Sequence, residues 1–347
     1  MIDSLRRLVE AESPSTDLDA LAQCAQVIDD LCWDVLGAGV EREGLTLRWR
    51  RPGERPVLLL CHYDTVWPPG TILGFPFTVE DGIARGPGVF DMKAGIVQAV
   101  WALRGVEGPV TVLFNPDEEI GSLASRTIIE REALDARAVL VLEPAQGRDV
   151  KVARKGTGHW RVDIRGRAAH AGLEPEKGIN AAIELAHVIG AIEEMADPEA
   201  GTSVIVTMAG AGSAENVVPE QAWVVTDARV WTMEEAERLD AAFTALSPTV
   251  AGATLTVSGG LNRGPLERHV SRELFERLLA LGYDVDGAEV GGASDGNFTA
   301  AMGIPTLDGL GPVGGGAHAR EEHVVLEEMP PRAAMVQRLL QDLLADG

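Results

Sequence analysis

Cysteine is scarce in this sequence, and its scarcity argues against two ways of stabilising a fold. Only three cysteines occur in 347 residues, Cys24, Cys32 and Cys61, and no two of them form a Cys-x-x-Cys pair. A disulfide framework and a cysteine-ligated zinc site are therefore both disfavoured. We expect three buried thiols in a protein of a reducing compartment.

Positive charge is also scarce. The chain carries 30 Lys and Arg residues against 53 Asp and Glu residues, which gives a net charge of −23 at pH 7. Nucleic acids and anionic membranes are bound through clustered Lys and Arg side chains. The composition thus argues against both as partners.

Long apolar runs are missing as well. No uncharged apolar stretch is long enough for a membrane-spanning helix, and the first ten residues already mix charged and apolar side chains in an amphipathic helical pattern. Hydrophobic residues still make up 46% of the chain, which is enough for the cores of two globular domains. We therefore expect a soluble cytoplasmic protein with two domains.

What the sequence does contain is a set of apolar strands that end in acids or histidines. The most pronounced is Val110–Ser122, which stops in three consecutive acids, Asp117, Glu118 and Glu119. In open α/β sheets the ligand crevice lies beyond the carboxyl ends of the strands, so this position would deliver the acids to a site. The alternative is an acidic turn that caps the next helix, with Ser122 at the N-cap.

Two further segments bring similar residues. The apolar run Val57–Val66 contains His62 and Asp64, which are two residues apart and therefore on the same side of a strand. A glycine-rich loop, Gly82–Gly95, carries Asp91 to the start of the next helix. The glycine spacing of this loop fits neither a dinucleotide-binding loop nor a P-loop.

The last two segments complete the pattern. Ala138–Pro144 is an apolar strand that ends in Glu143, and a strand predicted over Ile304–Pro312 leads through glycines to His318. Five segments thus deliver His, Asp or Glu side chains to one end of a predicted sheet. Imidazole and carboxylate ligands without thiolates suit zinc, and cobalt or manganese would also fit.

This set of residues is too large for one ion. It consists of His62, Asp91, Glu119, Glu143 and His318, with Asp64 and Glu118 beside them. Two ions about 3.5–4 Å apart, bridged by one carboxylate, would hold a water between them and lower its pKa toward about 7. A free carboxylate is then needed to accept the proton of that water.

The stretch from about Arg154 to Leu261 has a different pattern. Apolar and charged side chains alternate around Trp160, and helices are predicted over Ile179–Met195 and Met233–Leu246. With the intervening strands they give the order β-α-β-β-α-β of a ferredoxin-like unit. We therefore predict an inserted domain over residues 154–261 and one discontinuous α/β domain formed by residues 1–153 and 262–347.

These motifs, in this order, resemble those of the dinuclear zinc peptidases, a family that includes glutamate carboxypeptidase, acetylornithine deacetylase, succinyl-diaminopimelate desuccinylase and aminoacylase. The resemblance covers essentially the whole chain. It implies a catalytic domain with a mixed, largely parallel sheet and an inserted lid and dimerisation domain. It also implies two divalent ions per chain held by the five candidate ligands, with Asp91 as the bridge and Asp64 orienting His62.

The resemblance assigns roles to four further residues. Glu118 would be the general base and acid. Arg229 would hold the α-carboxylate of the substrate, with Asn216 nearby as a substrate-binding amide. His170 would reach the site of a partner subunit in a homodimer and stabilise the oxyanion of the tetrahedral intermediate.

Three positions depart from the family pattern. Cys61 and Ala94 stand where glycine is common, and His323 stands where tyrosine is frequent. None of the three is an implied ligand. The segment Gly291–Asn297 looks most like the glutamate carboxypeptidase branch.

We therefore expect a metal-dependent hydrolase that cleaves an amide next to a free α-carboxylate, as a carboxypeptidase acting on small peptides. An N-acyl-amino-acid deacylase would use the same chemistry and is the first alternative. A non-catalytic relative that acts as a binding protein is the second. Such relatives usually lose a ligand or the base, whereas this chain retains all of them.

Overall fold

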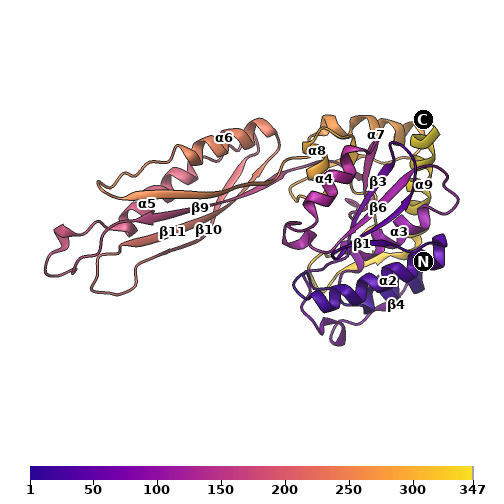
Figure 1. The fold of residues 1–347 in the computed structure, drawn as a ribbon, viewed down its shortest axis with the longest axis horizontal. Helices are drawn as coiled ribbons and strands as arrows, with labels where there is room; N and C mark the ends of the chain where they lie inside the picture. Colours follow the sequence, from indigo (N-terminus) through magenta and orange to yellow (C-terminus); the bar gives the residue numbers. More distant parts are fainter. Residues whose placement is uncertain (346–347) are drawn as a thin grey trace. The chain divides into compact units, whose positions relative to one another are not determined.

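A computed structural model describes residues 1–345, which divide into two compact units labelled by their elements in Figure 1. The first unit contains Met1–Arg154, Leu266–Val290 and the residues from Ser294 onward. The second contains Lys155–Pro265 together with Gly291–Ala293. The second unit runs past Leu261 because its last strand continues to Arg263.

A six-stranded mixed sheet forms the centre of the first unit, with the order β1-β2-β6-β3-β7-β14. Strand β2 is antiparallel to both of its neighbours, and β6, β3, β7 and β14 are parallel to one another. The strands are β1 (Glu41–Glu43), β2 (Thr46–Arg51), β3 (Val57–His62), β6 (Val110–Asn115), β7 (Ala138–Val141) and β14 (Thr306–Leu307). Every residue of β3 and β6 is buried, as expected for parallel strands covered on both faces.

Helices supply the two covers. Leu59 and Cys61 of β3 pack in a large core with α1, α2, α3 and α9, whereas Leu58 and Leu60 face the other way and pack with α4 and α8. The helices of this unit are α1 (Ile2–Glu10), α2 (Leu18–Leu36), α3 (Ala94–Ala102), α4 (Arg126–Leu134), α7 (Arg268–Ala280), α8 (Gly296–Ala301) and α9 (Met329–Ala345). All three cysteines are free and buried, which confirms the expectation of three buried thiols.

Short strands around the main sheet were not predicted. One small sheet joins β4 (Thr78–Glu80), β5 (Ile83–Arg85), β16 (His323–Val325) and β15 (Gly314–Gly315), and another pairs β8 (Val150–Arg154) with β13 (Gly287–Val290). The strand predicted over Ile304–Pro312 was too long, since only Thr306–Leu307 is extended in the sheet. The chain then turns at Gly309, which has a positive φ of 70° that favours glycine.

The second unit has a four-stranded antiparallel sheet with the order β10-β11-β9-β12. Its elements are β9 (Gly156–Arg165), α5 (Ala181–Glu193), β10 (Ser203–Ala211), β11 (Gln221–Val230), α6 (Met233–Thr244) and β12 (Thr254–Arg263). In the core, the ring of Trp160 stacks on that of Phe243 at a centroid distance of 4.6 Å. The β-α-β-β-α-β order with the first and third strands at the centre is the ferredoxin-like arrangement, as predicted.

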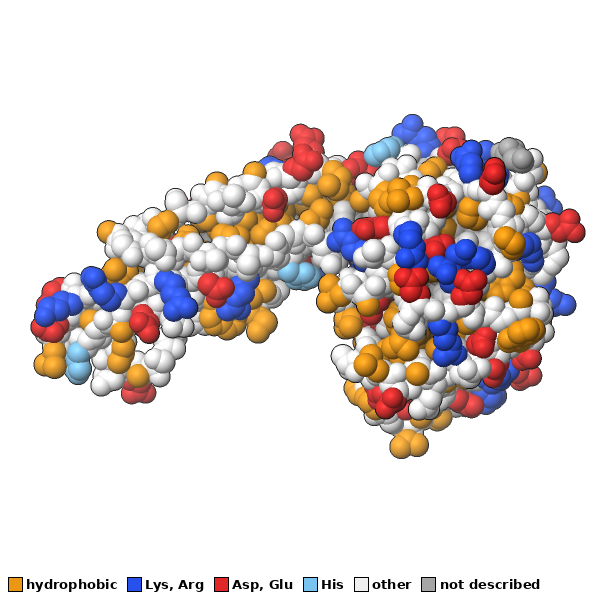
Figure 2. Space-filling view, in the orientation of Figure 1, with side chains coloured by type: hydrophobic (Ala, Val, Ile, Leu, Met, Phe, Trp, Pro, Cys, Tyr) orange, Lys and Arg blue, Asp and Glu red, His pale blue; other side chains and the backbone are white. Residues whose placement is uncertain are grey.

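No helix within residues 1–345 is both long and apolar enough to cross a bilayer. On the face shown in Figure 2, acidic and basic side chains of the first unit lie beside one another. An example is Arg48, whose Nη1 lies 2.7 Å from Oε1 of Glu132. The cytoplasmic location stays a prediction.

Candidate metal centre

The five predicted ligands lie in two groups that share Asp91. One group is His62, Asp91 and Glu143, the other is Asp91, Glu119 and His318, and the potential ligand atoms of each lie within 4.8 Å of one another. Nε2 of His62 is 3.2 Å from Oδ1 of Asp91, and Nε2 of His318 is 3.3 Å from Oδ2. The two oxygens of one carboxylate therefore face two different sites.

Parallel strands explain how residues far apart in sequence meet here. His62 is the last residue of β3, Glu119 follows β6 in the short turn η3 (Glu118–Ile120), and Glu143 follows β7 by two residues. Because these three strands are parallel neighbours, their carboxyl ends share one edge of the sheet. Nε2 of His62 is consequently only 3.3 Å from Oε1 of Glu143.

The other two ligands come from irregular segments. Asp91 lies in the turn Val89–Lys93 that leads into α3. His318 follows the glycines of β15 and has a φ of 62°, a left-handed conformation that is uncommon for residues other than glycine. Backbone strain of this kind concentrates at functional sites. In this conformation Nε2 of His318 lies 3.2 Å from Oε2 of Glu119.

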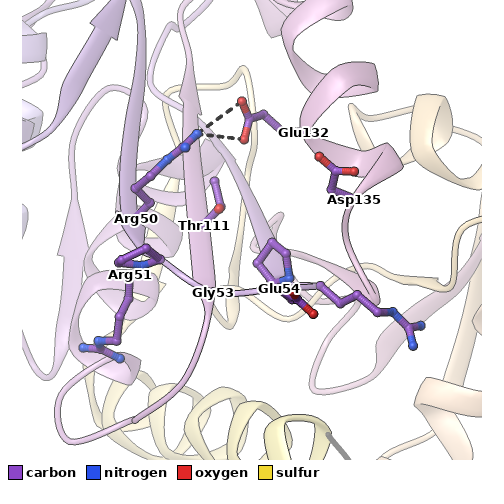
Figure 3. A pocket seen from close by; sticks show the side chains of 10 residues that line it. Arg50, Arg51, Gly53, Glu54, Thr111, Glu132 and Asp135 are labelled. Carbon is purple, nitrogen blue, oxygen red and sulfur yellow. Dashed lines mark hydrogen bonds and ion pairs between the residues drawn. The ribbon is translucent and has the colours of Figure 1, made fainter.

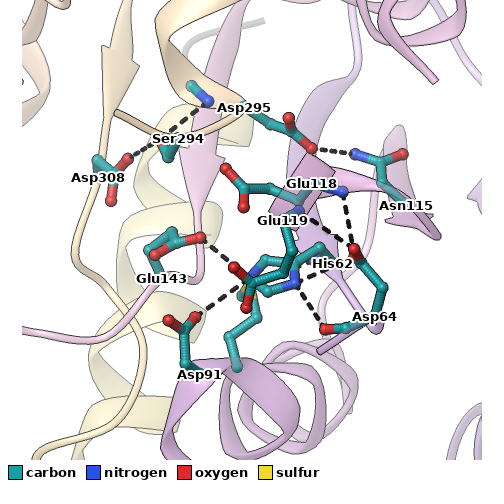
Figure 4. Close-up of polar contacts among 12 residues, drawn as sticks. His62, Asp64, Asp91, Asn115, Glu118, Glu119, Glu143, Ser294, Asp295 and Asp308 are labelled. Carbon is teal, nitrogen blue, oxygen red and sulfur yellow. Dashed lines mark hydrogen bonds and ion pairs between the residues drawn. The ribbon is translucent and has the colours of Figure 1, made fainter. Parts of the chain in front are cut away.

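Asp64 holds residues of the site in place through hydrogen bonds, as Figure 4 shows. Its carboxylate is fully buried and accepts hydrogen bonds from the backbone N–H groups of Glu118 and Glu119, both at 3.1 Å, and from the hydroxyl of Ser15 at 2.7 Å. Nδ1 of His62 lies 3.1 Å from the carbonyl oxygen of Asp64 and 3.4 Å from its Oδ1. Acceptors around Nδ1 place the ring proton there and leave Nε2 to bind a metal.

The residues present fit a pair of divalent ions. Two imidazoles and three carboxylates without a thiolate are the donors that zinc, cobalt and manganese accept. Oε1 of Glu119 is buried and has no hydrogen-bond partner. A buried carboxylate oxygen without a partner is costly, and an ion between Asp91, Glu119 and His318 would satisfy it.

The charges of the site are strongly coupled. Hydrogen bonds to Asp91 and Glu119 raise the pKa of His318 to about 10. Burial lowers the pKa of His62, but its contacts with Asp64, Asp91 and Glu143 outweigh burial and raise this pKa well above its usual value. A metal ion would therefore have to displace a proton from each imidazole.

Comparison with known proteins identifies the fold and the chemistry. The family model described as peptidase family M20/M25/M40 matches residues 58–342. The chain belongs to this family. Carboxypeptidase G2 of Pseudomonas sp. (strain RS-16) is 30% identical over 377 residues, which cover 99% of this chain and 89% of that protein. Succinyl-diaminopimelate desuccinylase of Dechloromonas aromatica (strain RCB) is 28% identical and covers 92% of this chain and 96% of its own length.

Solved structures share the fold of this M20 peptidase. Aminopeptidase PepT from Bacillus cereus has a TM-score of 0.76 at 21% identity and covers 99% of this chain and 97% of its own. The M20 metallo-carboxypeptidase Sso-CP2 from Sulfolobus solfataricus has a TM-score of 0.72 at 14% identity and covers 99% of both chains. The protein is therefore a metal-dependent hydrolase of the M20 family, and the predicted α/β fold with an inserted ferredoxin-like unit is confirmed.

Glu118 of the M20 peptidase belongs to neither ligand group. It begins η3, is 9% exposed, and its backbone is held by Asp64 next to the ligand Glu119. Its charge also helps to raise the pKa of His62. Glu118 thus directly precedes a candidate ligand without belonging to either ligand group.

The alternative interpretation, in which the acidic turn caps the next helix, is correct for Asp117 only. Its carboxylate accepts hydrogen bonds from the N–H of Ala124 and the hydroxyl of Ser125, both at 2.6 Å, where α4 begins. Ser122 is not the N-cap, because Ser125 directly precedes the helix. The hydroxyl of Ser122 instead donates to the buried carboxylate of Asp295.

Two buried groups that support the ligands were missed by sequence reasoning. The first is Glu322, which is fully buried and accepts hydrogen bonds from the N–H groups of Gly88, Phe90 and Asp91 at 2.9–3.1 Å and from the indole of Trp67 at 2.8 Å. One carboxylate therefore fixes the turn that carries Asp91, the residue shared by both ligand groups. In a chain with 53 acids, no spacing distinguishes this one.

The second is Arg154, which the sequence suggested only as a domain boundary. Its guanidinium is bidentate on Asp308, at 2.7 and 2.9 Å, and its Nη2 lies 3.3 Å from Oε2 of Glu143. The hydroxyl of Ser294 also donates to Asp308, at 2.6 Å. Glu143 therefore presents Oε1 to His62 while Arg154 holds its other oxygen.

The remaining predicted residues lie in the second unit. Nδ1 of His170 accepts hydrogen bonds from the N–H groups of Gly172 and Leu173 at 3.1 and 3.2 Å, which leaves Nε2 as the nitrogen that carries the proton. The neighbouring N–H of Ala171 donates to the carbonyl oxygen of Asn216 at 2.9 Å. His170 and Asn216 thus lie on paired segments.

Arg229 is placed apart from this pair, on β11. Its Nε and Nη2 bind the two carboxylate oxygens of Asp227 at 2.8 and 2.9 Å. The guanidinium is about one third exposed. The structure thus gives Arg229 a partner within its own strand.

A hollow elsewhere in the first unit has no part in the metal centre. It has a volume of about 540 Å³ and lies at the opposite edge of the sheet, beside the residues that precede β3 and end β2. Its lining carries both signs of charge, and Nη2 of Arg50 pairs with Oε2 of Glu132 at 3.1 Å (Figure 3). None of the five candidate ligands lines it.

Proposed function

We propose that this M20 hydrolase is a carboxypeptidase that cleaves an amide next to a free α-carboxylate and releases the C-terminal amino acid. The observation that carries the proposal is the carboxylate of Asp91, which faces one ligand group with each oxygen, while Glu118 directly precedes the candidate ligand Glu119. The chemistry supplied by a bound ion pair is polarisation of the scissile carbonyl and acidification of water. We propose zinc as the metal, with cobalt or manganese as alternatives.

Glu118 would move the proton. In this proposal its carboxylate accepts a proton from the attacking water and then gives that proton to the nitrogen of the leaving amine. The bond from water oxygen to carbonyl carbon forms, the carbon–nitrogen bond breaks, and the general base returns to its starting state. Asp64 contributes by holding the backbone of Glu118 through a buried hydrogen bond of 3.1 Å.

Residues of the second unit would bind the substrate. Arg229 would hold the α-carboxylate with Nη1, which is outside its pair with Asp227, and Asn216 would donate its amide. Nε2 of His170 carries a proton and is suited to donate to an oxyanion. We propose that His170 does so in the site of a partner subunit of a homodimer.

An N-acyl-amino-acid deacylase is the second candidate. The succinyl-diaminopimelate desuccinylase of Dechloromonas aromatica matches 92% of this chain at 28% identity, close to the values for carboxypeptidase G2. Both reactions break an amide beside an α-carboxylate, so the same residues serve either. The two candidates differ in the group on the acyl side of that amide.

A hydrolysis panel separates these candidates. The zinc-loaded protein is offered dipeptides, N-aroyl amino acids of the folate type, N-acetyl amino acids and N-succinyl diamino acids. A carboxypeptidase should favour the first two classes, and replacement of the α-carboxylate by a carboxamide should lower kcat/KM by tenfold or more, since a charge-assisted bond of about 1.5–3 kcal/mol is lost. Equal rates for acid and carboxamide would contradict the proposal.

A further inference from the structure

A second hollow of the first unit, with a volume of about 410 Å³, adjoins the candidate metal centre. Three short segments form its walls, Pro14–Thr16, Thr65–Pro69 and Glu119–Ile120. Glu119 belongs both to this hollow and to the ligand group of Asp91 and His318. The Trp67 hollow, as we call it, therefore borders the candidate metal centre at Glu119.

Hydrogen bonds within the protein hold the walls of the Trp67 hollow together. The N–H of Thr65 donates to the carbonyl oxygen of Ser13 at 2.8 Å, and the N–H of Ser15 donates to that of Thr65 at 3.3 Å. The hydroxyl of Ser15 is taken up by Asp64. The indole N–H of Trp67 is held by Glu322 at 2.8 Å. These four donors of the walls are thus already bound within the protein.

The walls also expose two large apolar side chains. Val66 is 43% exposed and Ile120 is 49% exposed, although both are large hydrophobic residues. No Lys, Arg or His lines the hollow, and its one acid is Glu119, which the candidate metal centre uses. Exposed apolar side chains around a concavity are typical of ligand sites.

We propose that the Trp67 hollow binds the group on the acyl side of the scissile amide, and that this group is apolar, an aryl or branched aliphatic residue. The inference rests on the proposed function, in which Arg229 takes the α-carboxylate on the other side of the amide. The acyl group extends away from that carboxylate, and the hollow is a concavity that shares Glu119 with the ligand set. A carboxylate-bearing acyl group such as succinyl would lose water there and gain no cationic partner, which is unfavourable.

Substrates that share one C-terminal amino acid and differ in the acyl group test the inference. The kcat/KM of the zinc-loaded enzyme should be at least tenfold higher for benzoyl or isovaleryl than for acetyl, and lowest for succinyl. Val66→Arg should reduce the ratio of benzoyl to succinyl kcat/KM by tenfold or more, because it adds a cation to the wall. Ile120→Ala should lower kcat/KM more for benzoyl than for acetyl, because it removes apolar surface that only the larger acyl group fills.

A matched control lies nearby. Leu73 is 89% exposed and does not line the hollow, so Leu73→Arg should leave the acyl preference as in the wild type. Hydrolysis of the series with no apolar preference, or with a preference that Val66→Arg leaves unaltered, would overturn the inference while the proposed function stands.

If the enzyme hydrolyses no member of the series, the proposed function is wrong. A binding measurement then tests the inference by itself. Zinc-loaded Glu118→Ala protein should bind 3-phenylpropanoate at least tenfold more tightly than succinate by calorimetry, and Val66→Arg in that background should reduce the difference. Equal binding of the two acids would overturn the inference on its own.

Discussion

Replacement of Glu322 by Gln tests how much of the metal centre depends on a buried carboxylate that touches no candidate ion. Oε1 of Glu322 accepts from Phe90 and Asp91, and Oε2 accepts from Trp67 and Gly88. In Glu322→Gln one oxygen becomes an amide nitrogen, which cannot accept. Two buried N–H donors are then left without an acceptor, whichever way the amide is turned.

The magnitude follows from these contacts. Two lost bonds to a charged acceptor would cost about 3–6 kcal/mol, and removal of a buried charge offsets part of this loss, for a net decrease of about 2–4 kcal/mol in the free energy of unfolding. Burial indeed raises the pKa of Glu322 above its usual value. Since these hydrogen bonds fix the turn that carries Asp91, their loss should lower the zinc affinity by about 10–100-fold.

The assay is denaturant unfolding of the zinc-loaded protein, together with competition of bound zinc against a chelator. Glu321→Gln is the matched control, because Glu321 is the exposed neighbour and should change neither quantity. Wild-type stability and wild-type zinc affinity in Glu322→Gln would refute the argument that this carboxylate fixes the Asp91 turn.

Three further predictions concern proton transfer and assembly. Glu118→Ala should keep two zinc ions by metal analysis and lose about 10²–10⁴-fold in kcat, and near-wild-type turnover would show that the base is wrongly assigned. At pH 7, which is below the pKa of about 10 for His318, both imidazoles should be protonated, so zinc binding to the stripped protein should release about two protons and tighten as pH rises. Calorimetry in several buffers measures the release, and a value of zero would contradict the protonated imidazoles. Subunit exchange between inactive His170→Ala and Glu118→Ala should restore turnover, and proven heterodimers without activity would show that His170 does not act across a dimer.

Much of the site could be predicted because strand ends have a simple geometry. An apolar run that ends in His62 and another that ends in Glu119 must meet if the strands are parallel neighbours, and β3 and β6 are such neighbours. The alternation of apolar and charged residues around Trp160 likewise predicted a strand of the second unit, and the structure has β9 there. The resemblance to a known family supplied the order of the motifs and the roles of residues on irregular segments, such as Asp91.

The supporting contacts could not be predicted in the same way. Glu322 lies more than 230 positions after the residues whose N–H groups it accepts, and Arg154 meets Asp308 over a separation of 154 residues. Such contacts have no periodicity in the sequence, because they depend on how distant loops pack. The short strands β15 and β16 were missed for a similar reason, since a few residues extended by tertiary pairing carry no strand pattern of their own.

The central claim is that Asp91 bridges two metal ions, and zinc stoichiometry tests it most directly. Stripped protein is titrated with zinc by calorimetry, and bound metal is measured per chain after gel filtration. We predict about two ions for the wild type, about one for His318→Ala and for Glu143→Ala, and a marked weakening of both sites in Asp91→Ala. Saturation of the wild type at one ion per chain, or an Asp91→Ala variant that retains two ions at wild-type affinity, would contradict the bridged pair.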